Sequence, residues 1–185
     1  MNNAIGLVEC ISIGRGYEAA DAMVKRAGVT LLACRTVCSG KHITMVGGDV
    51  AAVNASVEAG LKTAEGSVID HFVIPNIHES IIPAILGASP VDISTGQVSL
   101  GIIETFTVAS LILSADAAVK AANVVPVEVR VAIGIGGKSH VTLVGEVSAV
   151  KSAVEAGASL AAQNGLLISK VVIPSLSADV LRAIL

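Results

Sequence analysis

Short apolar runs alternate with amphipathic stretches along the first half of the chain. The run at residues 5–11 is apolar and brief, which is typical of a buried strand. Over residues 17–26, Ala20, Met23 and Val24 recur at spacings of three and four, so this stretch predicts a helix with one apolar face. The pattern therefore begins with a strand followed by a helix.

A hairpin and a second helix are predicted next. Residues 29–37 and 43–46 read as two strands around a turn, and Asp49 is placed to cap a helix that runs to about residue 65. A strand at 68–74 and a short helix at 79–86 complete this half. The predicted order is βαββαβ with a helical tail.

The second half of the chain repeats the first. Residues 5–9, 20–25, 57–60 and 73–75 return as residues 100–104, 115–120, 154–157 and 172–174. The offset between the copies grows from 95 to 99 at turns, where extra backbone length is tolerated. We therefore expect two tandem domains, residues 1–88 and 99–185, joined by a linker of small and polar residues at 89–98. Each is predicted to be an α/β (α+β) domain of the ferredoxin-like βαββαβ type, an antiparallel sheet flanked by helices.

The composition points to association between subunits. Hydrophobic residues make up 53% of the chain, charged residues 15% and aromatic residues 2%, whereas an ordinary soluble domain has about 25% charged residues. Two small cores cannot bury that much apolar surface, so we expect an obligate oligomer. The small residues Ala19, Ala20 and Ala22 of the first predicted helix are expected to face a neighbouring subunit.

Several partners are excluded by the same data. No apolar run reaches the roughly 18 residues needed to cross a bilayer, and the start of the chain lacks the regions of a signal peptide, so we expect a cytosolic protein without membrane contact. A net charge of -3 and the lack of a basic run argue against nucleic acid. The three cysteines form no CxxC pair, so reduced thiols are expected rather than disulfides.

The two copies differ in one loop. It reads TVCSGK at residues 36–41 and AIGIGGK at residues 132–138, so only the first copy carries a cysteine, Cys38. Iron-sulfur clusters are normally held by about four thiolates, so Cys38 could ligate one only where a symmetry axis gathers several copies of the chain. The residues themselves leave a second interpretation open, in which Cys38 lines a pore or packs within the turn.

The repeated segments resemble the bacterial microcompartment shell-protein domain. The resemblance rests on residues 6–9, 20–25, 48–53 and 73–75 and on their copies, and it covers nearly the whole chain. It is strongest to tandem-domain members from propanediol-utilisation shells, which carry a cysteine loop at the place of Cys38. It implies a homotrimer that imitates a hexameric tile and joins other shell proteins in the shell of a cytoplasmic microcompartment.

The resemblance also implies roles for individual residues. Cys38 from three subunits would hold one four-iron, four-sulfur (4Fe-4S) cluster at the central pore, for electron transfer with a redox enzyme inside the shell or in the cytosol, and air would remove the cluster. The two loops would line the pore through Ser39, Gly40, Lys41, Gly134, Ile135, Gly136, Gly137 and Lys138. The residues expected at the tile edge are Lys25, Lys120, Asn76 and His78. The family's edge motif Pro-Arg-Pro-His lacks its arginine in both copies, since Asn76 and Ser175 take that place.

Other functions account for fewer of these features. The same tile could have a metabolite pore without metal, and a soluble oligomeric module that binds a regulatory effector is a third hypothesis. An enzyme has the least support: residues 132–139 fit a relaxed phosphate-loop pattern, but a strand rather than a helix is predicted after them. Glu9 and Glu104 recur in both copies, so we expect a shared structural role such as bonding backbone amides. The polar residues that flank the loops are otherwise expected to be exposed to solvent: Lys41, Lys138, His42 and His140.

Overall fold

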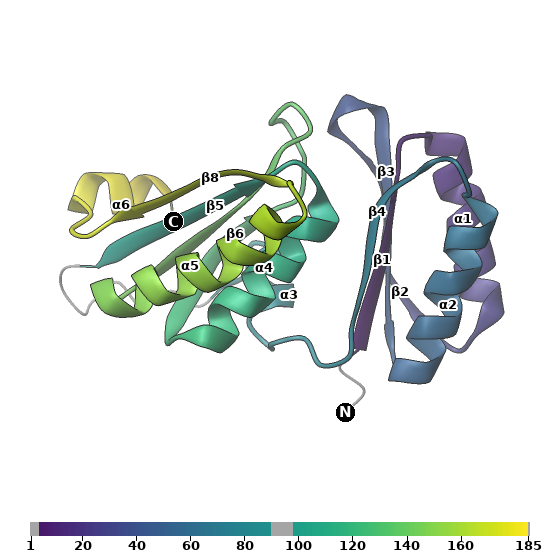
Figure 1. The fold of residues 1–185 in the computed structure, drawn as a ribbon, viewed down its shortest axis with the longest axis horizontal. Helices are drawn as coiled ribbons and strands as arrows, with labels where there is room; N and C mark the ends of the chain where they lie inside the picture. Colours follow the sequence, from purple (N-terminus) through teal and green to yellow (C-terminus); the bar gives the residue numbers. More distant parts are fainter. Residues whose placement is uncertain (1–3, 90–97, 185) are drawn as a thin grey trace. The chain divides into compact units, whose positions relative to one another are not determined.

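The computed structural model describes residues 4–89 and 98–184, which form two compact units (Figure 1). The first unit comprises the chain up to Ile77 together with two short segments of the second repeat, Thr107–Ala109 and Ala132–Gly137. The second unit comprises the other residues from His78 onward. Most of the linker expected at residues 89–98 lies outside the described residues, and the domain boundaries at 88 and 99 stay predictions.

The first unit is a four-stranded antiparallel sheet with the strand order β2-β3-β1-β4. Helices α1 and α2 pack against each other and cover one face of the sheet (Figure 1). The elements are β1 (Ala4–Cys10), α1 (Ile13–Arg26), β2 (Thr30–Val37), β3 (Lys41–Gly48), α2 (Val50–Thr63) and β4 (Val68–Ile74). The predicted βαββαβ order is confirmed.

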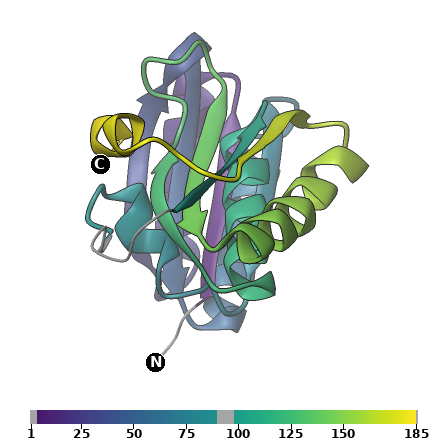
Figure 2. The same cartoon turned by 90° about the vertical axis from the view of Figure 1, so that its left-hand side faces the viewer.

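The second unit has the same topology, with the strand order β6-β7-β5-β8. Its elements are α3 (Ile81–Ile85), β5 (Ser99–Thr105), α4 (Val108–Ala121), β6 (Val124–Arg130), β7 (Ser139–Gly145), α5 (Val147–Gln163), β8 (Leu167–Ile173) and α6 (Ala178–Ile184). Helices α4 and α5 lie on one face of this sheet and α6 lies on the other (Figures 1 and 2). The predicted fold class, two antiparallel α/β domains in tandem, is confirmed.

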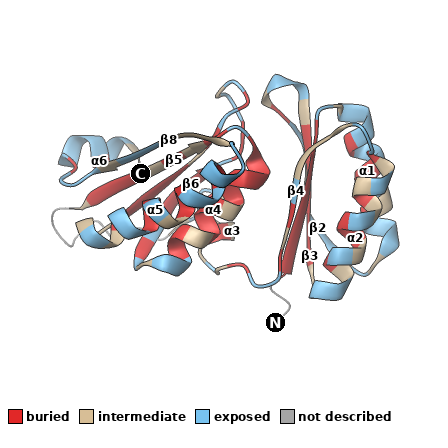
Figure 3. Ribbon diagram, in the orientation of Figure 1, coloured by how far each residue is buried: buried red, intermediate tan, exposed pale blue. Residues whose placement is uncertain are grey.

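Strand β1 is the buried centre of the first sheet. All seven of its residues are buried (Figure 3), because it pairs with β3 on one side and β4 on the other, so that Ile5 lies opposite both Gly47 and Ile74. Glu9 is buried along with its apolar neighbours. A carboxyl group at such a position needs polar partners, since burying a charge without them is costly.

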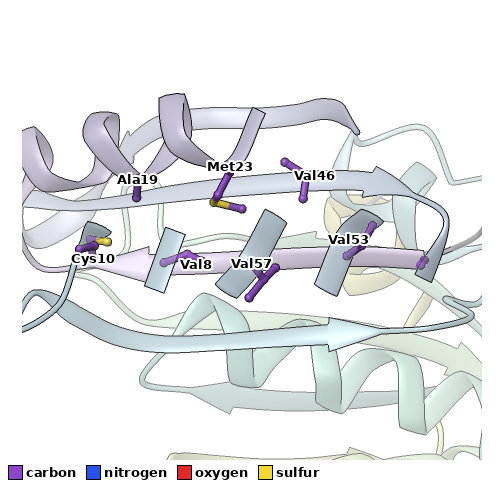
Figure 4. Close-up of a cluster of buried hydrophobic side chains, with 9 residues drawn as sticks. Val8, Cys10, Ala19, Met23, Val46, Val53 and Val57 are labelled. Atoms are coloured by element: carbon purple, nitrogen blue, oxygen red, sulfur yellow. The ribbon is translucent and has the colours of Figure 1, made fainter. Parts of the chain in front are cut away.

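The core of the first unit is built from small and medium side chains. Figure 4 shows Val8 and Cys10 of β1, Ala19 and Met23 of α1, Val46 of β3, and Val53 and Val57 of α2. Both Ala19 and Ala20 are buried inside the chain, at 0% and 6% exposure. The prediction that they face a neighbouring subunit is therefore wrong, because the helix turns this side toward its own sheet, and Ala22 is half-buried.

Two side chains cap the helices of the first unit. The predicted cap Asp49 is confirmed, since its Oδ1 accepts a hydrogen bond from the Ala52 amide at 2.9 Å. Ser12 caps α1 by accepting from the Arg15 amide at 3.4 Å. Helix α1 therefore starts at Ile13, four residues before the predicted start at Tyr17.

Among the described residues, no helix is both long and apolar enough to traverse a bilayer.

Candidate functional site

The cysteine loop is a tight turn between β2 and β3. Val37 pairs with Lys41 across the hairpin, which leaves one short turn of helix, Cys38–Gly40, to reverse the chain. Ser39 and Gly40 both have left-handed backbones, with φ of 65° and 70°. A serine rarely adopts this conformation, so other contacts must hold the loop in place.

Those contacts come from the matching loop of the second repeat, which belongs to the first unit. The Cys38 amide donates to the Ala132 carbonyl at 2.7 Å, and the Gly134 amide donates to Cys38 Sγ at 2.9 Å. The Ser39 hydroxyl donates to the Gly136 carbonyl at 3.3 Å. The cysteine loop and the glycine-rich loop of the second repeat are thus joined by hydrogen bonds into one structure.

Gly137 is required where the loops meet. Its φ is 82°, and a Cβ atom there would lie 2.7 Å from Ser39 Oγ. Any larger residue would therefore be strained in its own backbone and would also push Ser39 away. The other predicted loop residues are more open: Gly40, Gly134, Gly136 and Lys138 are exposed and Ile135 is half-buried.

The second loop favours the ionised form of Cys38. Backbone amides of Ile135 and Gly134 point toward the sulfur and lower the pKa of the Cys38 thiol below its ordinary value. Successive backbone amides in a turn form an anion-binding nest of this kind. Because the thiolate is the form that ligates metals and attacks electrophiles, Cys38 is chemically prepared for either role.

The donor set of one chain is too small for an iron-sulfur cluster. In the described part of the chain, no group of three or more His, Cys, Asp or Glu side chains is placed to hold a metal ion. Cys10 is buried in the core, and Cys34 is half-buried with its Sγ 3.7 Å from His42 Nε2. Cys38 fits a cluster only as one ligand among several copies, each supplying a thiolate and its amide nest.

Lys41 reaches inward from the loop to a buried carboxyl group. Its Nζ lies 3.1 Å from Glu9 Oε1, with the lysine side chain 15% exposed. The other oxygen, Glu9 Oε2, accepts from the amides of Val108 and Ala109 at 2.8 and 3.2 Å. Burial raises the pKa of Glu9, and Lys41 and the two amides offset part of that rise.

These contacts decide two predictions. The expectation that Glu9 bonds backbone amides is confirmed, and the expectation that Lys41 is exposed to solvent is wrong, because the lysine pairs with Glu9. Glu104 differs from its counterpart: its Oε2 accepts from the Ser169 hydroxyl at 3.1 Å. Lys138 is exposed as expected.

His42 is a core residue of the first unit. It is fully buried, its ring centroid lies 4.6 Å from that of Tyr17, and burial lowers its pKa. The expectation of an exposed histidine is wrong, because β3 continues from Lys41 and places His42 opposite Cys10 on the helix-covered face. His140 is half-buried, with its Nε2 3.6 Å from Glu128 Oε2.

Two of the residues expected at the tile edge lie on helices, Lys25 on α1 and Lys120 on α4. Lys25 pairs with Asp21 at 2.7 Å, and Lys120 pairs with Asp116 at 2.5 Å. The amide of His78 donates to Asp116 Oδ1 at 2.8 Å, and Asn76 is exposed. Their edge role stays a prediction.

Both repeats match a known family. The BMC domain matches residues 4–77 and again residues 99–176. The chain belongs to the BMC domain family. It is 46% identical over 174 residues to the bacterial microcompartment shell protein PduT of Citrobacter freundii, a match that covers 94% of this chain and 93% of that protein. It is 43% identical over 82 residues to the carboxysome shell protein CcmK2 of Synechococcus elongatus, covering 42% of this chain and 80% of that one.

A solved structure agrees with this assignment. The crystal structure of a microcompartment protein from Desulfitobacterium hafniense DCB superposes with a TM-score of 0.85 at 52% identity, covering 97% of this chain and 98% of that one. The protein is therefore a shell protein with two BMC domains in tandem, and its family is structural. This membership favours the shell hypotheses over the regulatory module.

Proposed function

We propose that three copies of this chain form a pseudohexameric tile in the shell of a cytoplasmic bacterial microcompartment. We further propose that Cys38 of all three copies holds one 4Fe-4S cluster at the central pore, for electron transfer across the shell. The observation that carries the proposal is the contact between the two loops, in which the Gly134 amide donates to Cys38 Sγ at 2.9 Å. Together with the neighbouring amides, this contact lowers the thiol pKa. Such backbone donors to cluster sulfurs also tune the reduction potential of iron-sulfur sites.

The duplication supports a shared site. A trimer of two-domain chains has six similar loops around its centre, of which three carry a thiol and three carry only backbone amides. Each cysteine loop is held by its amide-bearing neighbour within the same chain, through the Gly134 and Gly136 contacts. Three thiolates leave one iron of the cluster without a thiolate, and the Ser39 hydroxyl, water or a partner protein would supply its ligand.

The remaining roles follow from this arrangement. The two loops line the pore, and the exposed Lys25, Lys120 and Asn76, together with the half-buried His78, lie where tiles meet other shell proteins. A redox enzyme inside the microcompartment or in the cytosol exchanges electrons with the cluster.

A tile with a metal-free pore is the second candidate. In this candidate the same hydrogen bond from the Gly134 amide to Cys38 Sγ is purely structural, because it gives the sulfur a partner inside its own chain. In that case Cys38 serves to hold the two loops together. Iron analysis separates the two candidates.

The test is anaerobic purification of three proteins: the wild type, Cys38→Ser and Cys34→Ser. The wild type and Cys34→Ser should be brown, with sulfur-to-iron charge-transfer absorbance and about 1.3 iron atoms per chain. Cys38→Ser should lack iron. Cys34 is the matched control because it is also a half-buried thiol, four residues away in β2. A wild type that stays free of iron after reconstitution would leave the metal-free pore as the function.

A further inference from the structure

The second unit contains a cavity on the face of its sheet that carries α6 (Figures 1 and 2). Its volume is about 580 Å³, which lies within the range of about 300–1,000 Å³ that small-molecule sites occupy. The wall is formed by β6, β7, the last turn of α6 and the segment that follows α3, all of them in one unit. The cavity is therefore defined within a single chain.

Four polar side chains from two neighbouring strands line this cavity: Glu128 and Arg130 of β6, and His140 and Thr142 of β7. Glu128 lies opposite Thr142 and Arg130 lies opposite His140, so all four are on one face of the sheet. Arg130 Nε lies 2.9 Å from Glu128 Oε1, and His140 Nε2 lies 3.6 Å from Glu128 Oε2. The Glu128 carboxylate is thus placed between the guanidinium and the imidazole.

The first repeat has apolar residues at the corresponding positions of β3. At the offset of 97 between these strands, Met45 takes the place of Thr142 and Ile43 takes that of His140. Met45 and Ile43 are buried, at 5% and 2% exposure. Apolar side chains thus satisfy the shared fold at these positions, so the fold alone does not explain the threonine and the histidine.

The neighbouring strand differs in the same way. Judged by the residues with which they pair, Ala33 of β2 takes the place of Glu128 and Arg35 takes that of Arg130. The arginine is present in both repeats, but the carboxylate beside it is present only in the second. The polar cluster is therefore a feature that the second repeat adds to the common sheet.

Two hydroxyl groups of the cavity residues are unmatched within the described part of the chain. Thr142 Oγ1 and Ser89 Oγ are both buried and form no hydrogen bond with the described residues. Thr142 is only 8% exposed, and both residues line the cavity. Because an unmatched buried hydroxyl lowers stability, a bound molecule that supplies the missing hydrogen bonds is favoured.

The charges and hydrogen-bonding groups of the cavity define the class of ligand. Since Glu128 and Arg130 have opposite charges, a ligand anion would meet a carboxylate and a ligand cation would meet a guanidinium. Helix α6 ends at the cavity with Ala183 and Ile184, and the carbonyl groups at a helix end are acceptors. The guanidinium supplies donors, and the two unmatched hydroxyls can both donate and accept. A neutral ligand with several hydroxyl groups matches this mixture, because each of its hydroxyls also donates and accepts.

We propose that this cavity binds a small, uncharged, polyhydroxylated molecule, a polyol or a monosaccharide, through Arg130, Glu128 and Thr142. A change of rotamer turns the hydroxyls of Thr142 and Ser89, which are shielded from solvent in the structure, toward the ligand. The site uses no residue of the cysteine loop, so it goes beyond the proposed function and does not depend on a cluster at Cys38.

Saturation-transfer difference NMR of the full chain tests the site, with xylitol and D-ribose as neutral probes and acetate and ethylamine as charged ones. The wild type should bind the two neutral probes. Thr142→Val removes one hydroxyl and should weaken that binding about threefold to tenfold. Arg130→Gln should weaken it about tenfold or more, because hydrogen bonds from a charged group are stronger. The matched control is Arg35→Gln, the same change in the first repeat, which should bind like the wild type.

Thermal unfolding without ligand separates a lost site from a lost fold. Thr142→Val should have a Tm equal to or above that of the wild type, because the variant lacks an unmatched buried hydroxyl. The proposal is overturned if the wild type binds neither neutral probe, if Arg130→Gln and Arg35→Gln bind equally well, or if only the charged probes bind. Cys38→Ser should bind the neutral probes like the wild type, so failure of this site and failure of the iron site are distinguishable.

Discussion

The repeat supplies a matched pair of glycines whose replacement should have different costs. Gly60 in α2 and Gly157 in α5 occupy the same position of the two copies. A Cβ atom at Gly157 would lie 2.5 Å from the Ser114 carbonyl oxygen and 2.7 Å from Ile103 Cδ1. At Gly60 it would lie 2.7 Å from Cγ and Sδ of Met23. The added methyl group would thus meet a helix backbone atom at Gly157 and a flexible side chain at Gly60.

The magnitudes follow from these neighbours. Alanine in place of glycine within a helix contributes up to about 1 kcal/mol of stability, and overpacking of a core costs about 1–3 kcal/mol. Because the Ser114 carbonyl cannot move without its helix, Gly157→Ala should fall at the upper end of that cost and lose about 2 kcal/mol net. Met23 can rotate away, so Gly60→Ala should change the free energy of unfolding by less than about 1 kcal/mol.

Thermal unfolding followed by circular dichroism measures the difference. For a chain of this size, Gly157→Ala should lower the Tm by about 4–8 °C, and Gly60→Ala should shift it by less than about 4 °C. All samples must have the same protein concentration, since association makes the Tm depend on it. The reasoning is refuted if Gly60→Ala proves as destabilising as Gly157→Ala.

Three further predictions concern single groups. Alkylation of Cys38 should follow a pKa below 9.0, the ordinary thiol value, and Ile135→Pro, which removes one amide donor, should raise that pKa while Ile135→Val leaves it unchanged. Burial raises the pKa of Glu9 above 4.5, so its contribution to stability is full below pH 4.5 and is lost as the pH rises through the folded-state pKa. In urea titrations the free energy of unfolding of the wild type should therefore fall relative to that of Glu9→Gln as the pH rises from 4.5. A rise of the wild type relative to the variant would contradict the assignment. Ser56→Ala removes the hydrogen bond from the buried Ser56 hydroxyl to the Met23 carbonyl, 2.9 Å long, and should cost about 1–2 kcal/mol in the same titrations, whereas a loss below about 0.3 kcal/mol would contradict a buried, satisfied bond.

The sequence pattern predicted the ends of strands and helices well where interactions between neighbouring residues determine them. The strand predicted at residues 68–74 matches β4 at both ends, because Pro75 cannot continue the ladder. The strand predicted at 43–46 is longer, Lys41–Gly48, because β1 and β2 pair with it on both sides. Helix α1 starts earlier than its apolar spacing suggested. Gly16 in its first turns is poor for a helix but is needed there, since a Cβ atom would lie 2.4 Å from the His42 ring.

The sequence singled out the two loops of the candidate site but not the contacts between them. A thiol confined to one of two repeated loops singled out Cys38. The bonds between these loops join residues 96 and 97 positions apart, which no local pattern predicts. The recurrence of Glu9 and Glu104 predicted a shared bond to backbone amides; Glu9 makes such bonds, whereas Glu104 accepts from the Ser169 hydroxyl. The burial of Lys41 and His42 depends on strand register and on the position of Glu9.

The most direct test of the shared site is native mass spectrometry of the protein purified and reconstituted without oxygen. If three copies share one cluster, the wild type should give one species with the mass of three chains plus a single 4Fe-4S cluster, and Cys38→Ser should give the same trimer without the added mass. Clusters bound to single chains or pairs of chains, or a cluster-bearing Cys38→Ser trimer, would contradict the shared site.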